Sequence, residues 1–179
     1  MRAKTEFGSF RHLTGRFFGA LWPGGPSQKD EEWVRQWLLP GEHELWRSMS
    51  GPDRRHGVGV ARRTLALLKG NTTREVAASA LLHDVGKLES GMGTVWRAAA
   101  TALALVVGRH RFAALRDSER WWRRRLRLYF THDKVGAALL AKAGSDPLTV
   151  AWAAQHHQGR ESWTVDLRIA DALKEADGD

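Results

Sequence analysis

A histidine directly followed by an aspartate, His83-Asp84, ends an apolar helical run and is followed at short spacing by Gly86 and Lys87. Aspartate is seldom buried unless something pairs with it, yet Asp84 follows a segment that has the composition of a protein core. A metal ion would resolve this conflict, because it accepts an imidazole nitrogen and a carboxylate oxygen together. The alternative is an ordinary helix C-terminus, with His83 near the last carbonyls and Asp84 in water. Taken alone, the pair favours this ordinary helix end.

Histidines recur at other positions where apolar helix faces are expected, namely His56, His132 and the adjacent His156-His157. Each of them alone would more often be an ordinary core or surface histidine than a metal ligand. However, five of the eight histidines of the chain occupy such positions, and together with Asp84 they are harder to dismiss as metal ligands. Imidazole and carboxylate suit Fe, Mn, Zn or Mg-like ions in hydrolytic sites with open positions. The chain has no cysteine, which excludes thiolate ligands, disulfides and cysteine nucleophiles and fits a reducing cytosol.

Helical periodicity and capping residues predict an all-α chain, and no convincing strand alternation is present. The first expected helix is short, with Ser27 as its N-cap and Pro40-Gly41 at its end. A capping box of Thr72 and Glu75 indicates the start of a helix over 73–84, and Asp146 with Pro147 indicates the start of a helix that ends at His157. The other expected helices cover residues 42–49, 53–69, 120–144 and 165–176. These helices must bring the candidate ligands together.

The length of 179 residues predicts a single domain, with a basic and aromatic N-terminal arm over residues 1–26 and a helical domain over 27–179. We expect the arm to be poorly ordered, and the alternative is an interfacial anchor that uses Phe17, Phe18 and Trp22. No secretory signal is convincing, and the apolar run over 98–107 is far shorter than the roughly 20 residues that a membrane span needs. A cytoplasmic location is therefore expected.

The basic charge of the chain is concentrated in one region. The net charge is +8, and the stretch from Arg109 to Arg127 has a local excess of six positive charges. In and next to this stretch, Trp121 and Trp122 are interleaved with arginines. The first interpretation is a solvated helical hairpin whose tryptophans pack on the core. The alternatives are peripheral contact with an anionic membrane and, less favoured, single-stranded nucleic acid.

The order of His56, His83-Asp84, His132, His156-His157 and a late aspartate resembles that of the HD-domain metal-dependent phosphohydrolase superfamily. The string from His83 to Lys87 is similar to the His-Asp-Ile-Gly-Lys form of its signature. Thr131-His132, the following Gly136-Ala137-Ala138-Leu139-Leu140 and His156-His157 resemble the branch that contains cyclic-dinucleotide phosphodiesterases. The resemblance covers roughly residues 42–177. The segment over about residues 91–129 is longer than a minimal domain of the superfamily needs, and we expect it to be an insertion. However, Gln158-Gly159-Arg160 follows the histidine pair where cyclic di-GMP enzymes have a Gly-Tyr-Pro signature, which puts their substrate in doubt.

This resemblance implies a single-domain helical bundle that hydrolyses a phosphoester of a nucleotide, cyclic dinucleotide or similar small molecule with a metal-activated water. It also implies one or two divalent ions, with Mn, Fe, Mg, Ni and Zn as candidates. Lys87 would contact a phosphate oxygen, or would be only a favourable cation near a helix C-terminus, and both alternatives stay open. The ligands that the resemblance implies are His56, His83, Asp84 and the late aspartate for one metal, with His132, His156 and His157 for a second metal and Asp84 as the bridge.

Two positions match the late aspartate, because Ala170-Asp171 and Ala176-Asp177 both fit the closing Ala-Asp of the superfamily. At about 100° per residue, Asp177 falls on the apolar face of the last helix, and Asp171 points almost opposite. We therefore select Asp177. The alternative for Asp177 is a solvated carboxylate near the chain end.

A second class of function is a non-catalytic regulatory or binding module that keeps the helical scaffold and uses its basic face for membrane or nucleic acid. The intact ligand set favours the hydrolase, because a module without chemistry has no need of the costly His-Asp cluster.

Overall fold

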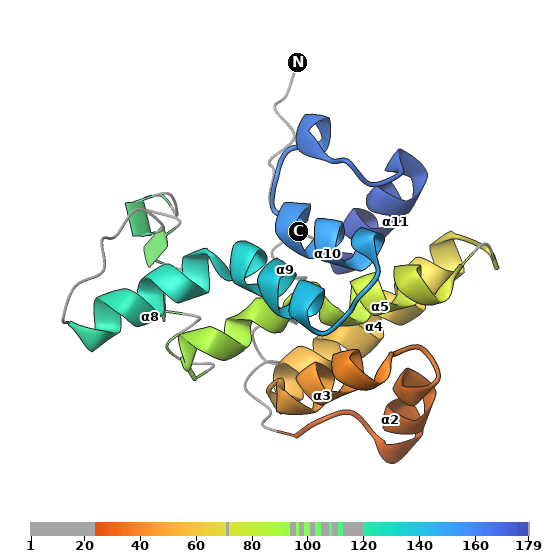
Figure 1. The fold of residues 1–179 in the computed structure, drawn as a ribbon, viewed down its shortest axis with the longest axis horizontal. Coiled ribbons are helices and arrows are strands. Elements are labelled where there is room, and N and C mark those ends of the chain that lie inside the picture. Colours follow the sequence, from red (N-terminus) through yellow and green to blue (C-terminus); the bar gives the residue numbers. More distant parts are fainter. Residues whose placement is uncertain are drawn as a thin grey trace.

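The computed structural model describes residues 24–70, 72–93, 96, 99, 100, 103, 104, 108, 111, 112 and 120–178. Within these ranges every regular element is an α-helix or a 3-10 helix, which confirms the predicted all-α class (Figure 1). Residues 1–23 of the N-terminal arm, with Phe17, Phe18 and Trp22, lie outside the described residues, as does most of the apolar run over 98–107. None of the described helices is both long enough and apolar enough to cross a bilayer.

The first two helices are α2 (Gln28–Arg35) and α3 (Pro40–Ser48). The Ser27 side chain accepts a hydrogen bond from the backbone N–H of Asp30, as expected for an N-cap. The prediction that Pro40 stops the first helix is wrong, because α2 already ends at Arg35 and Pro40 opens α3. Proline fits the first helical position, where it has no N–H to leave unpaired and its φ is already helical.

The next helices, α4 (Gly51–Leu67) and α5 (Arg74–Leu82), pack against each other in the centre of the molecule (Figure 1). A Cβ at Gly57 would lie 2.6 Å from the carbonyl oxygen of Leu81, so glycine allows the two backbones to approach closely. The apolar core around this contact contains the fully buried Trp46 and the almost fully buried Trp152.

Helix α5 differs from the prediction at both ends. Its N-cap is Thr73, not Thr72, and no side-chain hydrogen bond caps the helix. The expected helix over 73–84 also ends earlier, because His83 is the C-cap and the 3-10 helix η1 (Val85–Ser90) follows Asp84. The His83-Asp84 pair therefore lies at the junction between α5 and η1.

The single helix predicted over 120–144 is two helices, α8 (Trp121–Phe130) and α9 (His132–Lys142), separated by Thr131. A close backbone contact explains the break. A Cβ on Gly86 would overlap the carbonyl oxygen of His132 and would lie 2.5 Å from the backbone nitrogen of Gly136. Because η1 and the first turn of α9 touch at these glycines, α9 needs a direction that a straight continuation of α8 would not give.

The C-terminal part of α8 packs on η1, while its N-terminal end points away from the other helices (Figure 1). Trp121 and Trp122 at that end are 68% and 42% exposed. The expectation that these tryptophans pack on the core is therefore wrong for α8. The physical reason is that they precede the part of the helix that reaches the bundle.

Helix α10 (Pro147–Gln155) and helix α11 (Leu167–Asp177) complete the bundle, with the short 3-10 helix η2 (Arg160–Ser162) between them. The Asp146 side chain accepts from the N–H of Leu148, which confirms the predicted N-cap. Helix α10 packs on α5 and α9, and α11 packs on α4. The helix ends that carry the predicted ligands therefore surround the His83-Asp84 pair.

Candidate metal centre

Seven predicted ligands meet at one place in the fold, although they come from five separate segments of the chain. Most of them lie at helix ends, where a side chain can be presented without interrupting a helix. They are His56 within α4, His83 and Asp84 after α5, His132 at the start of α9, His156 and His157 after α10, and Asp177 at the end of α11.

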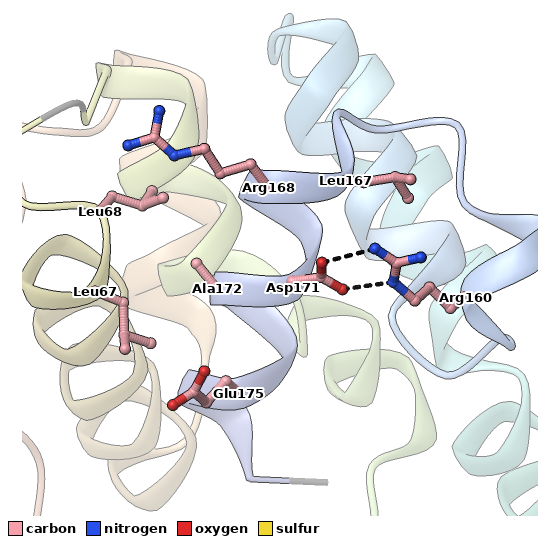
Figure 2. Close-up of a pocket in the computed structure, with 8 residues that line it drawn as sticks. All are labelled: Leu67, Leu68, Arg160, Leu167, Arg168, Asp171, Ala172 and Glu175. Atoms are coloured by element: carbon pink, nitrogen blue, oxygen red, sulfur yellow. Dashed lines mark hydrogen bonds and ion pairs between the residues drawn. The ribbon is translucent and has the colours of Figure 1, made fainter.

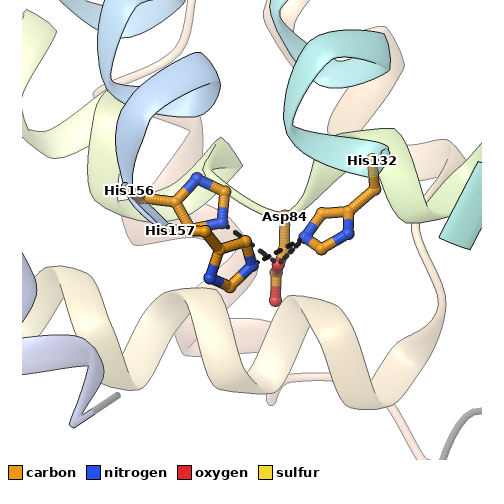
Figure 3. A group of neighbouring side chains, drawn as sticks. All are labelled: Asp84, His132, His156 and His157. Atoms are coloured by element: carbon orange, nitrogen blue, oxygen red, sulfur yellow. Dashed lines mark hydrogen bonds and ion pairs between the residues drawn. The ribbon is translucent and has the colours of Figure 1, made fainter. Parts of the chain in front are cut away.

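Asp84 is the centre of this cluster and is 5% exposed. Its Oδ1 atom lies 3.3 Å from Nε2 of His132 and 3.9 Å from Nε2 of His156. Figure 3 shows these histidines, with His157, gathered around the Asp84 carboxylate. Each of the four residues offers one ligand atom, and the four atoms lie within 4.8 Å of one another. This group has the size and composition of a metal site.

A second group lies on the other side of Asp84 and includes His56 and His83, whose ligand atoms also lie within 4.8 Å of one another and of the Asp84 carboxylate. Asp177 borders this group, with Oδ1 at 2.9 Å from Nε2 of His56 and 3.6 Å from Nε2 of His83. The two groups share Asp84. This is the bridging position that the resemblance implies for it.

The competing late aspartate lies outside the cluster. Asp171 has a side-chain exposure of 49% and accepts two hydrogen bonds from Arg160, at 2.8 and 2.9 Å (Figure 2). Asp177 is 4% exposed and faces His56, so the predicted helix face is confirmed. Its role as a metal ligand stays a prediction. Arg160 is an exposed arginine with a carboxylate partner, and the structure does not bring it to the cluster.

Three of the histidines share one orientation, in which Nδ1 donates to the backbone carbonyl three residues earlier and Nε2 faces Asp84. Such a hydrogen bond occupies Nδ1 and its proton, so that Nε2 is the ring nitrogen left to bind a ligand. These carbonyl acceptors were not predicted from the sequence. Their spacing of three residues follows from helix geometry once each histidine is placed at a helix end. The pairs are His83 with Ala80 at 2.9 Å, His132 with Tyr129 at 2.6 Å and His156 with Ala153 at 2.9 Å.

Two observations test whether a metal ion fits this donor set. The Nε2 atoms of His83 and His156 are buried, and neither has a hydrogen-bond partner among the described residues. Leaving a buried polar atom without a hydrogen bond costs about 1–3 kcal/mol, and a metal ion would bind both nitrogens once Nε2 of His83 has lost its proton. In addition, Nε2 of His157 lies 3.1 Å from Nε2 of His132, an arrangement that needs either a proton or an ion between the two nitrogens. The residues present therefore fit a divalent ion.

The charges in the cluster shift the pKa values of its members in opposite directions. Burial disfavours the His83 imidazolium, but the carboxylates of Asp84 and Asp177 outweigh burial and raise the pKa of His83 to about 9. Burial and the charge of His83 lower the pKa of His156 to about 3. Burial alone would raise the pKa of Asp84, but Lys87 and His83 hold it well below its usual range. The cluster therefore combines ionised carboxylates with one protonated and one neutral imidazole.

Lys87 lies in η1 with its ammonium in contact with Oδ2 of Asp84, and its side chain is 18% exposed. Burial would lower the pKa of Lys87, but the Asp84 charge outweighs this effect and raises it. The structure thus places Lys87 at the cluster, as expected. Its contact with a phosphate oxygen stays a prediction.

A hollow of about 440 Å³ lies between the end of α4 and α11 (Figure 2). Its lining includes Leu67, Arg160, Leu167 and Asp171, and none of the clustered histidines or aspartates contributes to it. This hollow is separate from the candidate metal centre.

Comparisons of the chain with protein-family models, with curated proteins and with solved structures found no match.

Proposed function

We propose that this chain is a metal-dependent phosphohydrolase that cleaves a phosphoester of a nucleotide, a cyclic dinucleotide or a similar small molecule. The observation that supports the proposal is the convergence of the predicted ligands on Asp84, with the Nε2 atoms of His83 and His156 buried and without a hydrogen-bond partner among the described residues. This is the arrangement that the resemblance to the HD-domain superfamily implies.

Two ion positions follow from the two groups of ligand atoms that share Asp84. In the proposal, one ion is held by His56, His83 and Asp84 together with Asp177, and the other by Asp84 and the remaining three histidines. Divalent ions in such sites supply Lewis-acid polarisation of a phosphoryl group and activation of a water molecule.

The residues of the chain have separate roles in this proposal. Asp84 bridges the two groups and, because its pKa is held low, offers an ionised carboxylate at neutral pH. Lys87 brings a positive charge beside Asp84 and donates to an oxygen of the bound phosphate. The carbonyl of Tyr129 holds the His132 ring in the orientation that presents Nε2 to the centre.

Metal analysis and a substrate screen test the proposal together. The full chain, loaded in turn with Mn, Fe, Mg, Ni and Zn, is assayed on a panel of nucleotides, cyclic dinucleotides and simple phosphoesters. We expect hydrolysis of at least one substrate, and joint loss of metal and activity in His83→Ala and His156→Ala. The matched control is His43→Ala in α3, a histidine that belongs to neither group of candidate ligands, and it should keep both properties.

Two results would contradict the proposal. Full activity in His83→Ala would exclude this site as the catalytic centre. Metal-loaded protein that hydrolyses nothing on the panel would favour the alternative of a non-catalytic binding module.

A further inference from the structure

Helix α8 presents a surface that the proposed hydrolysis does not use. We define its basic-aromatic patch as Trp121, Trp122, Arg124 and Arg125, all of which are exposed. Six large hydrophobic side chains are exposed among the described residues, and three of them are tryptophans, namely Trp96 and the two tryptophans of the patch. Two exposed tryptophans at adjacent positions of one helix indicate an interaction surface.

The charge of α8 indicates the kind of partner. The helix has four arginines and no acidic residue, and its first turn contains no carboxylate that would favour the helix dipole. Arginines so close to the beginning of a helix do not stabilise it, because the helix dipole is positive at that end. Their placement is better explained by an external partner with negative charge.

Each tryptophan of the patch has an arginine over its ring. The guanidinium of Arg125 lies 5.2 Å from the ring centre of Trp121, and that of Arg123 lies 5.2 Å from the ring centre of Trp122. The patch therefore presents amphipathic rings and positive charges in the same place, which is the composition of the interfacial region of membrane proteins.

We propose that α8 docks on an anionic lipid bilayer, with Trp121 and Trp122 in the headgroup region and Arg124 and Arg125 against the lipid phosphates. Single-stranded nucleic acid is disfavoured because base stacking needs open ring faces, and one face of each ring already meets a guanidinium.

The docked end of α8 is not far from the candidate metal centre. A helix of ten residues is about 15 Å long, and the last turn of α8 contains Tyr129, whose carbonyl orients His132. Docking through Trp121 would therefore hold His132 within about 15–20 Å of the lipid headgroups. The docking itself does not depend on metal binding or hydrolysis.

Vesicle flotation of the full chain tests this proposal. We expect binding to vesicles that contain phosphatidylglycerol, little binding to phosphatidylcholine alone, and weaker binding as salt is added. The Arg124→Glu/Arg125→Glu variant should lose binding at least tenfold, since each arginine near such a surface contributes about fivefold. The matched control is Lys142→Glu/Arg168→Glu, which makes the same charge change at exposed positions of α9 and α11 and should bind much as the unmodified chain does.

A second variant tests the tryptophans without a change in charge. Trp121→Ala/Trp122→Ala should lower vesicle binding at least tenfold. Its metal content should not change, and this control would show that the metal centre is intact. Brominated lipids should quench the fluorescence of the unmodified chain and quench Trp121→Phe/Trp122→Phe less. Unchanged binding in the alanine variant, equal quenching, or tight binding of a single-stranded oligonucleotide without binding to anionic vesicles would overturn the proposal.

Discussion

The Nε2 atom of His56 lies 2.9 Å from Oδ1 of Asp177, so a hydrogen bond joins two residues that are 121 positions apart in the chain. His56 lies within α4, and Asp177 is the last residue of α11. The same Asp177 oxygen is 3.6 Å from Nε2 of His83. The end of α11 therefore contributes to the cluster through its contacts with His56 and His83.

This contact predicts that Asp177→Asn weakens metal binding, because the amide lacks the negative charge that a divalent ion needs. We expect the affinity to fall at least about tenfold, as measured by competition with a chelator. Asp171→Asn is the matched control on the same helix, and it should only remove the exposed pair with Arg160. Equal metal affinity in the two variants would show that Asp177 is not a ligand.

The raised pKa of His83 predicts that metal binding releases protons. At pH 7 a His83 with a pKa of about 9 is protonated, and its imidazolium must lose the proton before Nε2 can bind an ion. Calorimetric titrations in two buffers with different ionisation enthalpies should therefore show about one proton released per chain. His156, with a pKa of about 3, is already neutral, so His156→Ala should weaken binding without changing this proton count. Identical heats in both buffers would contradict the prediction.

The same shift predicts the pH dependence of stability in metal-free protein. Because the folded-state pKa of His83 is raised, its contribution is complete below the unfolded value of 6.5 and is lost as the pH rises through about 9. The lowered pKa values of Asp84 and Asp177 act at the acid end, where their contribution is lost as the pH falls below the usual aspartate range. The Tm of chelator-treated protein should therefore decline between pH 6.5 and 9, and His83→Ala should show a smaller decline.

Local features of the sequence predicted most of the helices. Ser27 and Asp146 were identified as caps from residue type and position, and the structure shows both side chains accepting the expected backbone hydrogen bonds. Helical phase placed Asp177 on the buried face and Asp171 outside it, because α11 is regular over its whole length. Helical periodicity identifies the buried residues correctly where a regular helix packs against the bundle through one face.

The break at Thr131 could not be predicted in the same way. It depends on the approach of Gly86 to Gly136, a contact between residues far apart in sequence, which helical periodicity does not record. The meeting of His56 with His83 is non-local as well, and only the resemblance to a known family anticipated it. The prediction that Trp121 and Trp122 are buried failed for a related reason, because the sequence does not show which part of α8 contacts the bundle.

The approach of η1 to α9 predicts that Gly86→Ala is strongly destabilising. The added Cβ would overlap the carbonyl oxygen of His132, and neither backbone can move without disturbing the cluster. We expect a loss of about 1–3 kcal/mol, which corresponds to a Tm lower by roughly 2–12 °C. Gly93→Ala is the control, because no atom lies within 4 Å of a Cβ at that position. A similar Tm for both variants, measured by thermal unfolding, would show that the contact is looser than described.

A final prediction concerns Lys174 of α11, whose ammonium donates a hydrogen bond of 3.0 Å to the carbonyl of His156 at the end of α10. This bond links the helix that ends in Asp177 to the histidine pair, and a cation also stabilises the C-terminus of α10. Lys174→Met should therefore lower stability by about 1–2 kcal/mol and weaken metal binding, because His156 is less firmly placed.

Lys174→Arg keeps a donor and a charge and should restore most of both properties, whereas Lys142→Met, at an exposed position in the last turn of α9, should change neither. Thermal unfolding of metal-free protein and chelator competition separate the two effects. If Lys174→Met lowered the Tm but left metal affinity unchanged, Lys174 would stabilise the α10–α11 junction without positioning His156 for a metal ion.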